Sequence, residues 1–306
     1  MYEQITRNKW RSILLVFLVL AVAVGLGYLF GWLIGYGWIG VAIAVVIAIA
    51  MSWSSYRFGD RIVLRAVGAR PARREDHARL FNIVEGLTIA AGMPKPPAIY
   101  IIPEQAPNAF ATGRNPENSS IAVTQGLLDM LNRVELEGVL AHELSHITNR
   151  DILVGTLVAT LVGVIVLLSD WLMRAFFWGG IGGRRGGRDR GGGGGGAFAI
   201  VALVGLVLAV LAPIGAQLIR LAVSRRREYL ADANGALLTR YPPGLAGALR
   251  KISAAPNTMR RAANNATAHL WFAQPSRALT RRYSIMERLF STHPPVEERI
   301  RALEEM

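Results

Sequence analysis

The N-terminal 56 residues are dominated by apolar positions. No charged residue occurs between Ser12 and Tyr56, and glycines within 31–37 interrupt the apolar run. A helix needs roughly 20 apolar residues to cross the hydrocarbon core of a bilayer. The pattern therefore predicts two transmembrane helices within residues 1–56, separated at those glycines.

Two later apolar runs, 152–178 and 197–219, predict a third and a fourth transmembrane helix. A cleaved signal peptide is the alternative for the first run, because basic residues precede it and Ala21-Val22-Ala23 resembles a cleavage site. The apolar run continues far beyond that site, which favours a membrane span.

Two polar stretches, 57–151 and 220–306, remain outside the apolar runs. The first polar stretch predicts a helix over 76–91 and strands over 98–102 and 120–124, with a turn or irregular strand edge over 107–116 between them. It also predicts a helix that starts near Leu127 or Val134 and leads into His142. The second predicts helices, with breaks at 241–244 and 293–295. Together they are just long enough for one small core, so 152–219 is interpreted as an insertion. The fold class is a mostly α membrane protein with four transmembrane helices and a small α+β domain.

The charge distribution bears on membrane topology. The chain of 306 residues has a net charge of +13, and arginines follow the second and fourth apolar runs and accompany Lys9 near the N-terminus. Basic residues mark the cytoplasmic side of membrane proteins. We therefore expect both termini and both polar stretches to be cytoplasmic.

The loop over 179–196, rich in glycine and arginine, disagrees with this rule, because it would lie outside. Either the larger number of basic residues in the other segments sets the topology, or the third and fourth helices do not both cross the membrane fully. The composition indicates a flexible linker. Binding of single-stranded nucleic acid is the alternative, but no aromatic residue is interleaved with the arginines. We expect no nucleic-acid partner.

The sequence HELSH at 142–146 is the strongest chemical signal. On a helix, His142 and His146 lie one turn apart on one face and can bind one tetrahedral zinc ion per chain. Glu143 lies beside them, where it can take a proton from a water that the metal activates. The chain has no cysteine, so thiolate sites are excluded. Two surface histidines on a helix are the alternative.

A catalytic zinc site of this kind needs a third protein ligand and an open position. No histidine follows His146 closely, and the best candidates are Glu228 and Asp232, four residues apart. One carboxylate can bind the metal while the other holds a ligand histidine through its second nitrogen. We favour Glu228 as the ligand. The alternative is a solvated pair on a helix surface with arginine partners.

Four motifs carry a resemblance to a known family. They are AHELSHITNRD at 141–151, NAFATG at 108–113, SRRREYLADANGA at 224–236 and STHPPVEERI at 291–300. In this order they resemble HtpX-type membrane zinc metalloproteases, bacterial relatives of the CAAX-processing membrane proteases. The resemblance implies a thermolysin-like (gluzincin) domain merged with membrane helices, in the bacterial inner membrane. It also implies proteolysis of misfolded membrane proteins and unfolded polypeptides at the cytoplasmic face, as part of stress response and quality control.

The resemblance assigns zinc binding to His142, His146 and Glu228, and catalysis to Glu143, with Asp232 one turn beyond the third ligand. Two further roles are predicted. A strand edge that binds substrate is assigned to Asn108, Ala109, Phe110 and Ala111, and a donor to the oxyanion is assigned to His293. A plain turn and a capping or core histidine are the respective alternatives. His77 and His269 are interpreted as structural or surface residues.

The predicted organisation has four parts: two transmembrane helices in 1–56, the first part of the catalytic domain in 57–151, helices three and four with their loop in 152–219, and the second part of the catalytic domain in 220–306. Three rival functions are a membrane scaffold with structural zinc or none, a prenyl-protein processing enzyme, and a nucleic-acid binder. Glu143 argues against the first, because a structural site needs no base. The second would need more spans than four. The sequence gives no oligomeric state.

Overall fold

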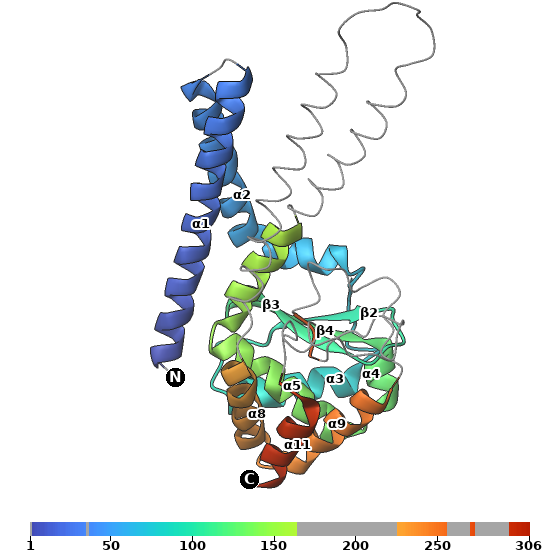
Figure 1. Cartoon of the computed structure of the whole chain (residues 1–306). Coiled ribbons are helices and arrows are strands. Elements are labelled where there is room, and N and C mark those ends of the chain that lie inside the picture. Colours follow the sequence, from blue (N-terminus) through green and yellow to red (C-terminus); the bar gives the residue numbers. More distant parts are fainter. Residues whose placement is uncertain (1, 35–36, 164–224, 256–269, 273–293) are drawn as a thin grey trace, which may run out of the picture.

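The structure is a computed structural model of the whole chain, and it describes residues 2–34, 37–163, 225–255, 270–272 and 294–306 (Figure 1). Most of the predicted third and fourth transmembrane helices, the loop at 179–196 and both His269 and His293 lie outside the described residues.

Two long helices form the N-terminal part of the molecule. α1 spans Tyr2–Ile34 and α2 spans Trp38–Ala66, and they pack side by side (Figure 1). The chain turns between them at Gly37, whose φ of 50° is easily reached by glycine. The predicted break between two apolar helices is thus confirmed.

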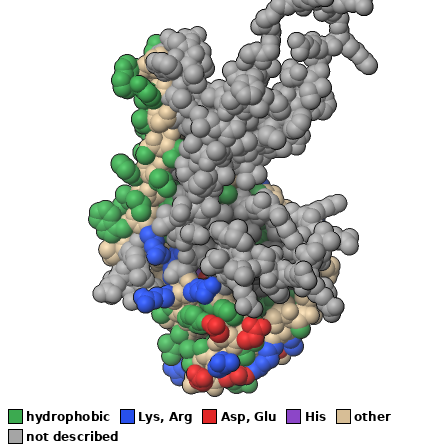
Figure 2. Space-filling view, in the orientation of Figure 1, with side chains coloured by type: hydrophobic (Ala, Val, Ile, Leu, Met, Phe, Trp, Pro, Cys, Tyr) green, Lys and Arg blue, Asp and Glu red, His purple; other side chains and the backbone are tan. Residues whose placement is uncertain are grey.

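Large apolar side chains cover the outer surface of this helix pair (Figure 2). Those most exposed are Trp10, Ile13, Leu14, Phe17, Trp38, Ile39, Ile43, Val46, Ile47, Ile49 and Trp53. Within the described part of the chain, Trp38–Ala66 is the helix that is long and apolar enough to cross a membrane, and Trp10–Val22 and Asp151–Gly163 are shorter apolar helical stretches. A patch of this size is unusual on a protein surrounded by water.

A four-stranded sheet lies beside the helix pair. Its strands are β1 (Arg70–Pro71), β2 (Ala98–Ile102), β3 (Ala109–Asn115) and β4 (Asn118–Thr124), in the order β1-β2-β4-β3. β2 and β4 are parallel, and β3 pairs antiparallel with β4 through an irregularity at Gly113/Asn115. The segment 107–116 is therefore an irregular edge strand and not a plain turn. The short strand β1 was missed by the sequence analysis.

Helices pack on one face of this sheet. They are α3 (Ala78–Ala90), α4 (Gln125–Met130), α5 (Arg133–Thr148), α8 (Arg225–Thr239), α9 (Pro242–Ala254) and α11 (Val296–Glu304). α5 contacts β3, α3, α8 and α9, so it lies at the centre of the helical layer (Figure 1). Its start is fixed by a capping box between Asn132 and Glu135. One hydrophobic core joins residues from both polar stretches around α5.

The chain makes a sharp turn at the end of α5. α5 ends at Thr148, with Asn149 as its C-cap. Arg150 follows with φ of 59°, a left-handed conformation that is uncommon for a residue with a side chain. A buried helix then begins at Asp151 and runs to Gly163. The turn brings the side chain of Asp151 back toward α5.

Candidate metal centre

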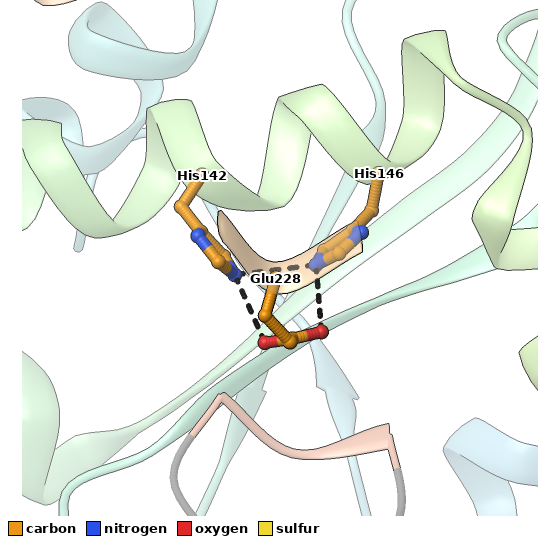
Figure 3. Close-up of side chains that lie close together, drawn as sticks. All are labelled: His142, His146 and Glu228. Atoms are coloured by element: carbon orange, nitrogen blue, oxygen red, sulfur yellow. Dashed lines mark hydrogen bonds and ion pairs between the residues drawn. The ribbon is translucent and has the colours of Figure 1, made fainter. Parts of the chain in front are cut away.

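Three side chains converge between α5 and α8. Candidate ligand atoms of His142, His146 and Glu228 all lie within 4.8 Å of one another (Figure 3). The two histidine Nε2 atoms are 3.2 Å apart, and the carboxylate oxygens of Glu228 lie 3.8 and 3.7 Å from them. Ligands about 2.0–2.1 Å from a tetrahedral metal are separated by about 3.3–3.4 Å from each other. The cluster therefore fits a tetrahedral ion with one position left open.

Two of the three side chains are buried, and His146 is partly exposed, with 17% of its side chain accessible. His142 is 1% exposed and Glu228 is 6% exposed. The alternatives of surface histidines and of a solvated carboxylate pair are therefore wrong for this fold. The sequence analysis could not exclude them, because burial depends on the packing of α8 against α5.

His142 is held from its far side by Asp232. Its Nδ1 lies 2.8 Å from Asp232 Oδ1. Arg299 on α11 donates from Nη2 to the same oxygen at 2.7 Å and from Nε to Oδ2 at 2.8 Å. Burial acts to raise the pKa of Asp232, but Arg299 and His142 outweigh it and hold the pKa below its usual value. A charged Asp232 therefore fixes the Nδ1–H tautomer of His142.

His146 has a matching partner that the sequence analysis missed. Its Nδ1 lies 3.0 Å from Asp151 Oδ2. Arg227 donates to Asp151 Oδ1 at 3.2 Å, as Arg299 does to Asp232. Asp151 is the last residue of the quoted motif at 141–151, but no role was assigned to it. Its position five residues after His146 would have been informative only with knowledge of the turn at Arg150.

These hydrogen bonds leave both Nε2 atoms turned toward the same space. With Nδ1–H donated to a carboxylate, each Nε2 carries a lone pair, and two lone pairs at 3.2 Å repel each other. Burial lowers the pKa of His142 to about 4. Burial acts in the same direction on His146, but Asp151, Glu228 and Glu143 together raise its pKa to about 9. A proton or a metal cation between the rings would relieve this repulsion.

Glu143 lies beside the cluster and is 2% exposed. Burial raises its pKa to about 7, with the charge of Glu228 acting in the same direction and that of His146 opposing it. The backbone N–H of Ala111 donates to its carboxylate. A carboxyl group with a pKa near neutrality can both accept and return a proton.

The predicted substrate edge, 108–111, lies across from α5 in β3. Asn108, Ala109 and Phe110 are each 0% exposed, and the N–H of Phe272 donates to the carbonyl of Ala109 at 2.8 Å. Phe272 also packs edge-on against His142, with ring centroids 5.0 Å apart. This strand is thus at the edge of the sheet, but Phe272 occupies one of its backbone acceptors. Its role in binding substrate stays a prediction.

A glycine allows α8 to approach the first ligand closely. A Cβ atom on Gly235 would lie 3.1 Å from the backbone nitrogen of His142. Gly235→Ala is expected to push α8 away by a few tenths of an ångström and to weaken metal binding several-fold. Competition with a chromophoric chelator measures this. Gly86→Ala in α3 is the control, because its Cβ would meet no atom within 4 Å. It is expected to stabilise the protein by up to about 1 kcal/mol and to leave metal affinity unchanged.

The paired histidines on α5, the buried glutamate between them and the glutamate from α8 form a candidate metal centre of the kind that metalloproteases use. The sequence model of Peptidase family M48 matches residues 74–306. Proteins named "Protease HtpX homolog" from Thermoanaerobacter pseudethanolicus and Thermococcus sibiricus are 43% and 45% identical, over 100% and 93% of this chain and 98% and 94% of theirs. The chain belongs to peptidase family M48 and is an HtpX-type metalloprotease. The resemblance seen in the four sequence motifs is thereby confirmed.

Among solved structures, the crystal structure of S. mikatae Ste24p matches with a TM-score of 0.46 and 16% sequence identity. The match covers 99% of this chain and 67% of that chain.

Proposed function

We propose that the chain is an integral membrane zinc endopeptidase that cleaves misfolded or damaged membrane proteins and unfolded polypeptides. The single observation that carries this proposal is the largely buried cluster of His142, His146 and Glu228 with buried Glu143 next to it. A structural metal site has no need of a buried carboxyl group with a pKa near 7 beside its ligands. The cluster therefore favours catalysis over the scaffold function.

Zinc is the metal that this donor set suits best. Two imidazoles and one carboxylate in tetrahedral arrangement, without any thiolate, are typical of catalytic zinc sites. Asp232 and Asp151 orient the two imidazoles and increase their basicity, which strengthens binding to a cation. One zinc ion per chain, bound between the two Nε2 atoms, would relieve the repulsion between their lone pairs.

The residues around the ion would have separate roles in peptide hydrolysis. A bound zinc ion supplies Lewis acidity that polarises the scissile carbonyl and lowers the pKa of water. Glu143 takes the proton from the attacking water as general base and passes it to the leaving amine. The hydrogen bond from the backbone of Ala111 holds the carboxylate of Glu143 toward the side where β3 runs. An extended substrate would bind along β3 at 108–111, and His293 would donate to the oxyanion.

The apolar helices are proposed to cross the bacterial inner membrane. The exposed apolar surface of α1 and α2 supports this, since such a surface is stable in lipid. We propose the predicted order of helices in 1–56, first catalytic part in 57–151, helices in 152–219 and second catalytic part in 220–306. The basic residues that follow the apolar runs support a cytoplasmic active site and cytoplasmic termini. A role in stress response and membrane quality control follows from this substrate class.

Metal removal tests the proposed function. Chelation of the detergent-solubilised protein is expected to abolish casein cleavage, and stoichiometric zinc is expected to restore it. Elemental analysis of the same samples should give one zinc per active chain. Cleavage by protein that holds no metal would contradict the proposal. Zinc binding without cleavage of casein, or of a misfolded membrane protein in lipid, would favour the scaffold.

A further inference from the structure

A polar side chain of the first helix reaches the metal centre. Asn8 on α1 is 2% exposed, although the side chains of Thr6 and Trp10 on either side of it are exposed. Its Nδ2 donates to Asp151 Oδ1 at 2.6 Å and to the carbonyl of Asn149 at 3.0 Å. A side-chain amide has two N–H donors, so both are used here.

Asp151 connects this amide to a proposed zinc ligand. Its Oδ2 accepts from His146 Nδ1 at 3.0 Å, and its Oδ1 accepts from Asn8 at 2.6 Å and from Arg227 at 3.2 Å. The terminal torsion of an aspartate is soft, so a carboxylate keeps one orientation only if both oxygens are held. Asn8 makes the shorter of the two contacts to Oδ1. The carbonyl of Asn149, at the turn that ends α5, in turn fixes the amide.

We propose that Asn8 is a positioning residue for the proposed zinc centre, acting through Asp151 on His146. The first membrane helix is then part of the structure that directs a ligand at the metal, in addition to anchoring the chain. This inference rests on the proposed function, because it assigns Asp151 to a zinc ligand. It gives a physical reason why the site lies close to the apolar helices: one of the hydrogen-bond donors of the site comes from α1.

The two arginine–carboxylate pairs show why Asn8 is needed on this side. Asp232 accepts two hydrogen bonds from Arg299, one on each oxygen, which fixes its orientation without further help. Arg227 donates from Nη1 to one oxygen of Asp151, Oδ1. The amide of Asn8 supplies the second donor to that oxygen. Loss of Asn8 is therefore expected to disturb His146 and not His142.

The test compares two buried polar residues one turn apart on α1. Asn8→Leu removes both donors while keeping the volume, and Ser12→Ala removes a hydroxyl whose bond goes to the backbone carbonyl of Asn8. Metal affinity is measured on the full chain in detergent by zinc competition with a chromophoric chelator. Asn8→Leu is expected to weaken zinc binding about 10-fold, the lower end of the usual effect of an outer-sphere partner. Ser12→Ala is expected to leave it unchanged.

A double-mutant cycle with Asp151→Asn separates positioning from general destabilisation. If Asn8 acts through Asp151, Asn8→Leu has little further effect on zinc affinity in the Asp151→Asn background. Additive losses, or an unchanged affinity for Asn8→Leu alone, would overturn the inference. The absorption bands of the cobalt-loaded protein give a second readout, which should change in Asn8→Leu and not in Ser12→Ala. If Asn8→Leu does not fold, Asn8→Ser undergoes the same cycle.

Failure of this inference is distinguishable from failure of the proposed function. A wild-type chain that binds no zinc would contradict the proposed function itself. A wild-type chain that binds zinc as proposed, together with Asn8 variants of unaltered affinity and cobalt spectrum, would contradict only the role of Asn8.

Discussion

Replacement of Glu143 by glutamine is expected to reduce the rate of peptide cleavage by about 10²–10⁴-fold, the range that a general base contributes. Glutamine has nearly the same shape, but its amide cannot take a proton from the attacking water. Glu143 is not one of the three clustered ligand side chains, so bound zinc should remain at one per chain. Casein cleavage and elemental analysis on the same preparation measure both properties.

The control for this substitution is Glu137→Gln on the same helix. Glu137 lies a turn and a half before Glu143, is partly exposed and is outside the cluster. Its substitution is expected to leave both cleavage and zinc content unchanged. Equal cleavage by wild type and Glu143→Gln would refute the role of Glu143 as the base. Loss of zinc from Glu143→Gln would instead mean that this residue stabilises the metal site.

Replacement of Glu228 by glutamine is expected to weaken zinc binding by more than about 100-fold. Loss of a residue that only orients a ligand costs at most about that factor, and loss of a ligand should cost more. Glu228 supplies the third donor and the one anionic ligand of the cluster, with its oxygens 3.7–3.8 Å from the two Nε2 atoms. A neutral amide oxygen is a poor substitute for a carboxylate at a zinc ion. Cleavage should be lost with the metal, and excess zinc should restore part of it.

Two comparisons make the Glu228 experiment specific. Glu305→Gln, at the exposed C-terminal end of α11, should have no effect on zinc affinity. Asp232→Asn should weaken zinc binding less than Glu228→Gln, since Asp232 contacts His142 Nδ1 and not the space between the ligands. If Asp232→Asn weakens zinc binding more than Glu228→Gln, then Asp232 is the ligand and Glu228 the orienting residue, which would contradict the assignment.

Local sequence patterns determined the chemical groups of the site. Two histidines four residues apart on a helix must share a face, because the helix repeats every 3.6 residues. The placement of His142, His146 and Glu143 on α5 follows from that spacing, and α5 begins at Arg133, next to Val134, one of its two predicted starting points. The two apolar helices at the N-terminus and the strands predicted over 98–102 and 120–124 also follow from local periodicity, although β4 begins two residues earlier, at Asn118.

Contacts between distant segments could not be predicted in the same way. The sequence suggested Glu228 over Asp232 as the ligand, but the choice depends on how α8 lies against α5 at Gly235. The partners Arg299, Arg227 and Asn8 carried no local signal, since each contacts a carboxylate far away in the chain. Asn8 lies between Arg7 and Lys9 in the polar first turns of α1, so its residue type did not distinguish it from its neighbours.

The sequence by itself thus determined which side chains form the candidate metal centre and which helices carry them. Tertiary structure alone decided the burial of the cluster, the pairing of His142 with Asp232 and of His146 with Asp151, and the participation of α1. The physical reason is that helical periodicity is set by the backbone over a few residues. The orientation of an imidazole is set by hydrogen bonds from elements that meet only when the core of the folded chain forms.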